Sequence, residues 1–134
     1  MRLLFLFLDG VGLGKADAAA NPLMRADMPH LKALLDGHRL LIDTPFPLET
    51  SRATLLPLDA CLGVAGMPQS ATGQAALLTG KNIPALIGYH YGPKPNPDVV
   101  DYLKNGNLFS VLGKAGLSTA LLNAYPPRYF DAID

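Results

Sequence analysis

Cysteine is almost absent from this chain, since Cys61 is the only one among 134 residues. A single cysteine excludes an internal disulfide and any metal site built from several cysteines. We interpret Cys61 as a small buried hydrophobe. An excess of charge is absent too, because eleven basic residues balance eleven acidic ones. Without a surplus of Lys and Arg to neutralise phosphates, we expect no nucleic-acid partner.

The chain also has no hydrophobic run of membrane-spanning length. Nothing in it approaches the ~20 apolar residues that a transmembrane helix needs. Residues 3–8 are apolar, but Asp9 ends this run when it is barely as long as the shortest hydrophobic region of a signal peptide. No small-residue cleavage site follows closely. We therefore expect a cytoplasmic protein with no membrane partner.

What is present favours a packed core, because 49% of the residues are hydrophobic. A chain of this length can bury roughly two-thirds of the surface that its unfolded form exposes. We therefore predict a single α/β domain over residues 1–134. Its small number of expected strands leaves two interpretations, a natural short domain or a fragment of a larger α/β protein, and we favour the fragment.

Apolar patterning predicts strands and helices in alternation. The continuous apolar run at residues 3–8 is typical of a strand covered on both faces. Strands are predicted at residues 3–8, 40–42 and 118–122. Helices are predicted at residues 28–35, 71–79, 99–104 and 108–114, and residues 44–68 are predicted to be mostly loop. This order indicates a partial parallel sheet flanked by helices.

The glycines after the first predicted strand match neither of two common phosphate-binding motifs. The dinucleotide motif G-x-G-x-x-G, counted from Gly10, requires glycine where Lys15 stands. The P-loop requires glycine in place of Asp9 and Ser or Thr in place of Ala16. Both alternatives are therefore excluded.

Asp9 and Gly10 follow the first predicted strand directly. In an open parallel sheet, ligands gather beyond the carboxyl ends of the strands. A carboxylate there is a natural ligand for a divalent metal ion. The alternative is that Asp9 only forms the turn that ends the strand.

Ser70 and Thr72 lie at the predicted start of the 71–79 helix, where unpaired N–H groups favour anions. Ser70 could simply be the N-cap of this helix. To act as a nucleophile, the Ser70 hydroxyl needs a group that activates it. No histidine stands nearby in the sequence to serve as a base, since Gln74 occupies the position where one would be expected. A metal ion held by Asp9 would serve that purpose.

Three segments carry a resemblance to a known family. They are Leu-Phe-Leu-Asp-Gly at residues 6–10, Met-Pro-His-Leu-Lys-Ala-Leu-Leu at residues 28–35 and Gln-Ser-Ala-Thr-Gly-Gln at residues 69–74. Together they resemble the N-terminal part of the alkaline phosphatase superfamily. The most similar branch is that of cofactor-independent phosphoglycerate mutase and phosphopentomutase, which has Asp-Gly after its first strand. Its nucleophile motif is Asn-Ser-x-x-Gly-His or Asp-Thr-x-Thr-Gly-His.

The resemblance implies a role for several residues. Ser70 falls on the nucleophile and would also bind metal, and Asp9 falls on the first metal ligand. Thr72 matches the catalytic motif, Ala71 and Gly73 would contact substrate, and N–H groups near Ala71 and Thr72 would bind phosphoryl oxygens. His90, between two tyrosines in a Pro- and Gly-rich loop, could touch substrate or anchor the loop.

The chain also departs from the family. Gln69 and Gln74 replace the usual polar and histidine neighbours of the motif. The family binds two divalent metal ions (Mn, Zn or Mg) through Asp-x-x-x-His and Asp-His motifs that lie mostly in the C-terminal half. The three histidines of this chain stand in no such motif, namely His30, His38 and His90.

The resemblance therefore implies the N-terminal part of a metal-dependent phosphohydrolase or phosphomutase acting on a small phosphorylated substrate. We expect residues outside this chain to complete the metal site, and the chain alone to be inactive. Two alternatives remain open. One is a non-catalytic α/β module that binds a small anion at the Ser70 helix N-terminus, and the other is a purely structural domain.

Overall fold

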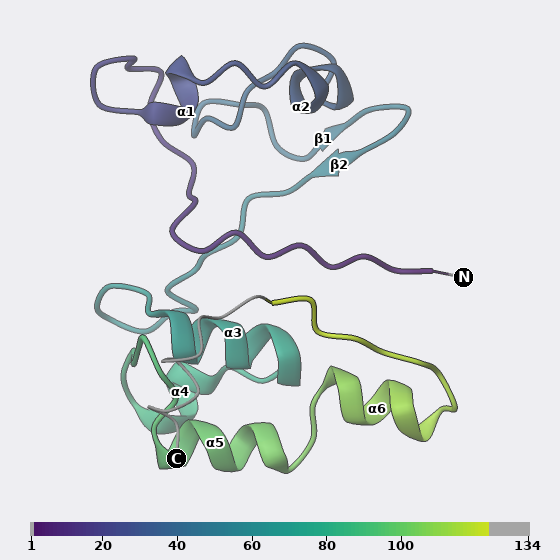
Figure 1. Ribbon diagram of the computed structural model, residues 1–134. Coiled ribbons are helices and arrows are strands. Elements are labelled where there is room, and N and C mark those ends of the chain that lie inside the picture. The colour runs from purple at the N-terminus through teal and green to yellow at the C-terminus, as the bar shows by residue number, and fades with distance from the viewer. Residues whose placement is uncertain (1, 124–134) are drawn as a thin grey trace. The chain divides into compact units, whose positions relative to one another are not determined.

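The computed structural model describes residues 2–123 and shows a mixed α and β chain whose described part divides into two compact units between Asp59 and Ala60 (Figure 1). Its helices are α1 (Pro22–Arg25), α2 (Pro29–Leu34), α3 (Ser70–Thr79), α4 (Ile83–Ile87), α5 (Pro97–Lys104) and α6 (Leu108–Lys114). Its strands are β1 (Leu48–Glu49) and β2 (Thr54–Leu55). None of the helices within residues 2–123 is long and apolar enough to cross a membrane.

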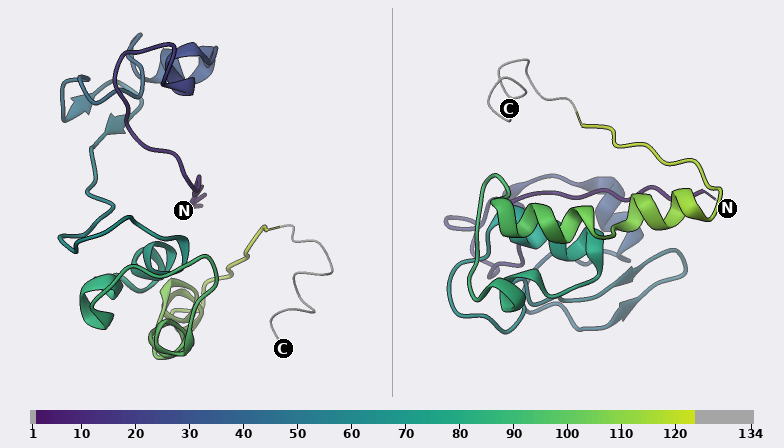
Figure 2. Two further views of the ribbon diagram at one scale, coloured as in Figure 1. Left: turned by 90° about the vertical axis from the view of Figure 1, so that its left-hand side faces the viewer. Right: turned by 90° about the horizontal axis from the view of Figure 1, so that it is seen from below.

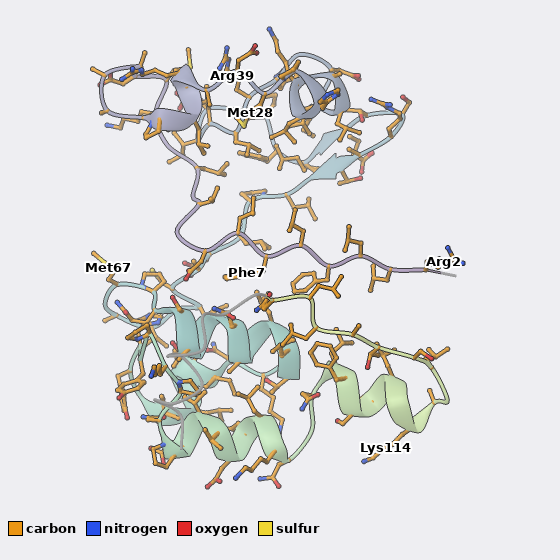
Figure 3. All side chains as sticks on the ribbon, in the orientation of Figure 1. Arg2, Phe7, Met28, Arg39, Met67 and Lys114 are labelled. Atoms are coloured by element: carbon orange, nitrogen blue, oxygen red, sulfur yellow. The ribbon has the colours of Figure 1, made fainter. Side chains whose placement is uncertain are left out.

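In the first unit, the short helix α1 is held at both ends by polar side chains. The Asn21 side chain caps its start by accepting a hydrogen bond from the Leu23 N–H at 3.1 Å. At its other end, Arg39 (labelled in Figure 3) donates from Nη1 to the carbonyls of Met24 and Ala26, at 2.8 and 3.4 Å. A helix of four residues is too short to be stable alone, so these contacts hold it in place.

A small hairpin follows in the same unit. Strand β1 pairs antiparallel with β2, in the register Leu48 to Leu55 and Glu49 to Thr54. The Thr50 hydroxyl donates to the Leu34 carbonyl at 2.9 Å, which connects the turn of the hairpin to the end of α2. The predicted loop at residues 44–68 therefore contains a two-stranded hairpin.

The second unit is built around helices α3, α4 and α5, which lie side by side (Figure 2). Its core consists of Ala75, Ile83 and Val99, with the last two fully buried. Burying a side chain of this size stabilises a fold by about 1.5–3 kcal/mol. These contacts hold α3, which carries Ser70, in a defined place within the unit.

The predicted helices are confirmed, with ends shifted by one or two residues. The structure has α2, α3, α5 and α6 where helices were expected. Asn96 and Asn107 cap the last two by accepting from Val99 and Ser110 N–H groups, and Gly80 ends α3 in a left-handed conformation with φ of 68°. Helices α1 and α4 were not expected, because each has only four or five residues; Pro22 is the first residue of α1, and Pro84 is the second residue of α4.

The predicted parallel sheet is not shown by the structure. Residues 3–8 and 118–122 are not strands, and the side chains of residues 3–8 are exposed. Among residues 2–123, the only parallel pairing is one bridge between Gly14 and Leu41. A strand needs a hydrogen-bonded neighbour, which apolar composition alone cannot provide.

Candidate functional site

Ser70 is the first residue of α3 and is half-buried. Gln69 precedes it as the N-cap, in an extended conformation with φ of −127° and ψ of 148°. The first bond of the helix runs from the Gly73 N–H to the Gln69 carbonyl at 2.9 Å. The interpretation of Ser70 as the N-cap is therefore wrong, because Gln69 occupies that position.

Thr72 lies two residues further into the helix and is fully buried. Its backbone N–H donates to the Tyr91 carbonyl at 3.0 Å, and its hydroxyl accepts from the Tyr91 N–H at 3.2 Å. The hydroxyl proton has two carbonyl acceptors, those of Gln69 and Tyr91, each at 3.3 Å. Thr72 thus connects the first turn of α3 to a loop nineteen residues later.

This loop also packs tightly against the start of the helix at Gly92. A Cβ atom on residue 92 would lie 3.0 Å from the Ser70 backbone nitrogen and 3.1 Å from the Gln69 Cβ. Real Cβ atoms rarely make contacts this short, so a side chain at residue 92 would require the loop or the start of α3 to shift. The 88–93 loop is therefore a direct neighbour of the Ser70 backbone.

His90 lies in the same loop and is half-buried. Its Nε2 atom is 3.2 Å from the Val64 carbonyl oxygen. A carbonyl only accepts hydrogen bonds, so Nε2 carries a proton in this arrangement. The contact attaches the loop to the segment that leads into α3, which agrees with the loop-anchor interpretation. Substrate contact by His90 stays a prediction.

Ala71 and Gly73 lie on either side of Thr72, in different surroundings. The Ala71 side chain is buried, whereas a Cβ atom on residue 73 would meet nothing within 4 Å. The N–H group of Thr72 is already bonded to Tyr91, which removes it from the expected donors to a phosphoryl group. The Ala71 N–H remains the candidate donor, and contact of substrate with Ala71 and Gly73 stays a prediction.

Asp9 lies in the first unit, in an exposed turn where Gly10 has a φ of 70°. The turn agrees with the interpretation of Asp-Gly as a chain reversal. Ser70 belongs to the second unit, so a metal ion shared by the two residues stays a prediction.

A metal centre needs more donors than these two residues supply. A carboxylate and a hydroxyl are hard oxygen ligands that suit Mg²⁺ or Mn²⁺, but such ions take about six ligands. Within residues 2–123 there is no group of three or more His, Cys, Asp or Glu side chains that could hold a metal ion. Completion of the site by residues outside this chain stays a prediction.

Sequence reasoning missed the residues that surround Ser70 in space. Tyr91 lies nineteen residues from Thr72 and Gly92 lies twenty-two from Ser70, and the contacts of both with the motif depend on tertiary structure. The one sequence feature that could have pointed to this contact was Gly92, a glycine within a proline-rich loop that was expected to be ordered.

Comparison with known proteins adds no assignment. No family model, no curated protein and no solved structure matches this chain. The resemblance to the alkaline phosphatase superfamily therefore depends on the three sequence segments alone.

Proposed function

We propose that this chain is the N-terminal part of a metal-dependent phosphohydrolase or phosphomutase in which Ser70 is the nucleophile. One observation supports this most directly: Ser70 opens a helix of ten residues without being its cap, and an ordered loop packs against its backbone. A helix start favours the negative charge of a phosphoryl group. A rigid loop beside the nucleophile would help to orient the substrate.

In the proposed reaction, the Ser70 Oγ atom attacks the phosphorus of a small phosphate ester. The bond between phosphorus and the ester oxygen breaks, and the alcohol leaves with a proton. The phosphoserine then passes its phosphoryl group to water in a hydrolase, or back to the substrate in a mutase. A divalent metal ion bound partly by Asp9 would ease deprotonation of the Ser70 hydroxyl.

We also propose that residues 3–8, 40–42 and 118–122, which form no sheet in this structure, become strands of a partial parallel sheet when an alkaline-phosphatase-like domain is complete. Support comes from residues 3–8, whose apolar side chains are exposed on both sides of the extended chain. Neighbouring strands and covering helices would remove these side chains from water. Asp9 would then lie at the carboxyl end of a strand, in a cytoplasmic enzyme whose remaining metal ligands come from residues outside this chain.

The test is phosphorylation of Ser70 in the native protein that carries these residues. Mass spectrometry of peptides from protein quenched during turnover with Mn²⁺ and a generic phosphate ester should find phosphoserine at residue 70. Ser70→Ala should abolish both the phosphopeptide and turnover, whereas Ser110→Ala, in the capping box of α6, should retain both. Full activity of Ser70→Ala would contradict the nucleophile assignment.

The same protein distinguishes the alternative function. An anion-binding module would bind inorganic phosphate equally well with Mn²⁺ and with EDTA, and would form no phosphoserine. The proposed enzyme requires the metal for phosphoserine formation, so its phosphopeptide should disappear in EDTA.

A further inference from the structure

We propose that Thr72 is a positioning residue whose hydroxyl holds the 88–93 loop against the start of α3 and so keeps Gly92 beside Ser70. In this role Thr72 does not touch the substrate. The inference deepens the proposed function, and it rests on that function only where it assigns the loop to a phosphoryl site.

The first observation is the double connection between Thr72 and Tyr91. The Thr72 N–H donates to the Tyr91 carbonyl, and the Tyr91 N–H donates to the Thr72 hydroxyl, at 3.0 and 3.2 Å. One residue of the helix thus pairs with both backbone groups of one loop residue. Two bonds to the same residue define the position of the loop backbone, whereas one bond would leave it free to rotate.

The second observation is that the Thr72 hydroxyl is buried and already hydrogen-bonded within the protein. The residue has no exposed surface, and its hydroxyl bonds are all to backbone groups of Gln69 and Tyr91. A hydroxyl with one proton and two lone pairs has little further capacity when it already donates and accepts inside the protein. A substrate phosphate could reach it only if the loop moved away.

The third observation is what the loop does once it is held. Gly92 directly follows Tyr91, and its Cα atom faces the Ser70 nitrogen so closely that a Cβ atom would lie at 3.0 Å. We call the two hydrogen bonds between Thr72 and Tyr91 the clamp. By fixing residue 91, the clamp determines the position of Gly92 and so the space next to Ser70. Loss of the Thr72 hydroxyl would alter that space without changing Ser70 itself.

The experiment compares Thr72→Val with Thr72→Ser in the full-length native protein. Valine has the shape of threonine but no hydroxyl, and it leaves the Tyr91 N–H without the acceptor that it has in the wild type. Serine keeps the hydroxyl and loses only a methyl group. Amide hydrogen exchange is measured at Tyr91, with Gly80 as the internal control, because the Gly80 N–H bonds to Ala76 at the far end of the same helix.

In Thr72→Val, exchange at Tyr91 should accelerate about tenfold relative to Gly80, as expected when the N–H loses its hydrogen-bond acceptor. In Thr72→Ser, the ratio should stay near that of the wild type. An unchanged ratio in Thr72→Val would overturn the clamp. Should Thr72→Val fail to fold, the wild type decides, since an unprotected Tyr91 amide in the folded protein would also overturn it.

Orthovanadate binding with Mn²⁺ tests the link to the phosphoryl site. Thr72→Val should bind vanadate about tenfold more weakly than the wild type, and Thr72→Ser should be close to wild type. Equal affinity of Thr72→Val and wild type would overturn the positioning role. If the wild type itself binds no vanadate, the proposed function fails, and the exchange ratio still decides on its own whether the clamp exists.

Discussion

Gly92 lies against Ser70 so closely that a Cβ atom on residue 92 would be 3.0 Å from the Ser70 backbone nitrogen. The two residues are twenty-two positions apart in sequence. The two nearest atoms are the Ser70 backbone nitrogen and the Gln69 Cβ, which cannot rotate away as the Gln69 Oε1 atom at 3.2 Å can. The contact makes the space beside the candidate nucleophile sensitive to a single methyl group.

Gly92→Ala should destabilise the second unit. The added methyl group must displace either the loop or the start of α3, and overpacking of this kind costs about 1–3 kcal/mol. Urea unfolding followed by helical circular dichroism measures the change, because α3, α5 and α6 dominate the signal. Unchanged stability would mean that the loop does not pack on Ser70 as described.

Gly73→Ala is the matched control, since it makes the same chemical change at the residue that directly follows Thr72. Residue 73 lies within α3, and a Cβ atom there would meet nothing within 4 Å. Alanine should therefore stabilise the helix by about 0.5–1 kcal/mol. If Gly73 lets substrate approach the helix, the same variant should weaken vanadate binding while unfolding at higher urea. Lower stability would show that the space around residue 73 is not open.

Ile83→Ala should strongly destabilise the α3, α4 and α5 cluster. Ile83 is fully buried in its core, and truncation of such a side chain costs about 2–5 kcal/mol through lost burial and a new cavity. Ile83→Val is the control, with an expected cost of about 0.5–1.5 kcal/mol. The urea midpoints of the two variants measure the difference. Equal midpoints for Ile83→Ala and wild type would contradict the assignment of this core.

Asp9→Asn should weaken binding of Mn²⁺ by the full-length native protein, because an amide oxygen lacks the charge of a carboxylate. Isothermal titration gives the affinity and stoichiometry. Asp27→Asn is the control, since Asp27 is also exposed in the first unit and lies outside the proposed site. Metal binding by Asp9→Asn with unchanged affinity and stoichiometry would remove Asp9 from the metal site.

Local signals in the sequence were sufficient for most helices. Helix formers at residues 74–78 and Gly80 mark α3, and leucine-rich patterns mark α2 and α6, so these elements could be predicted before their packing was known. The strands could not be predicted in the same way. An apolar run such as residues 3–8 indicates that cover is needed, but apolar composition does not supply the hydrogen-bonded neighbour that a strand requires.

The candidate site likewise has features that the sequence predicts and features that only the tertiary structure shows. The sequence by itself determined that a serine stands at the start of a helix, because propensity and glycine signals act within a few residues. Only the tertiary structure decided that Gln69 is the cap, that Thr72 pairs with Tyr91, and that Gly92 lies beside Ser70. The contacts of Thr72 with Tyr91 and of Ser70 with Gly92 join residues nineteen or more positions apart, and they form only when the loop is packed onto the helix.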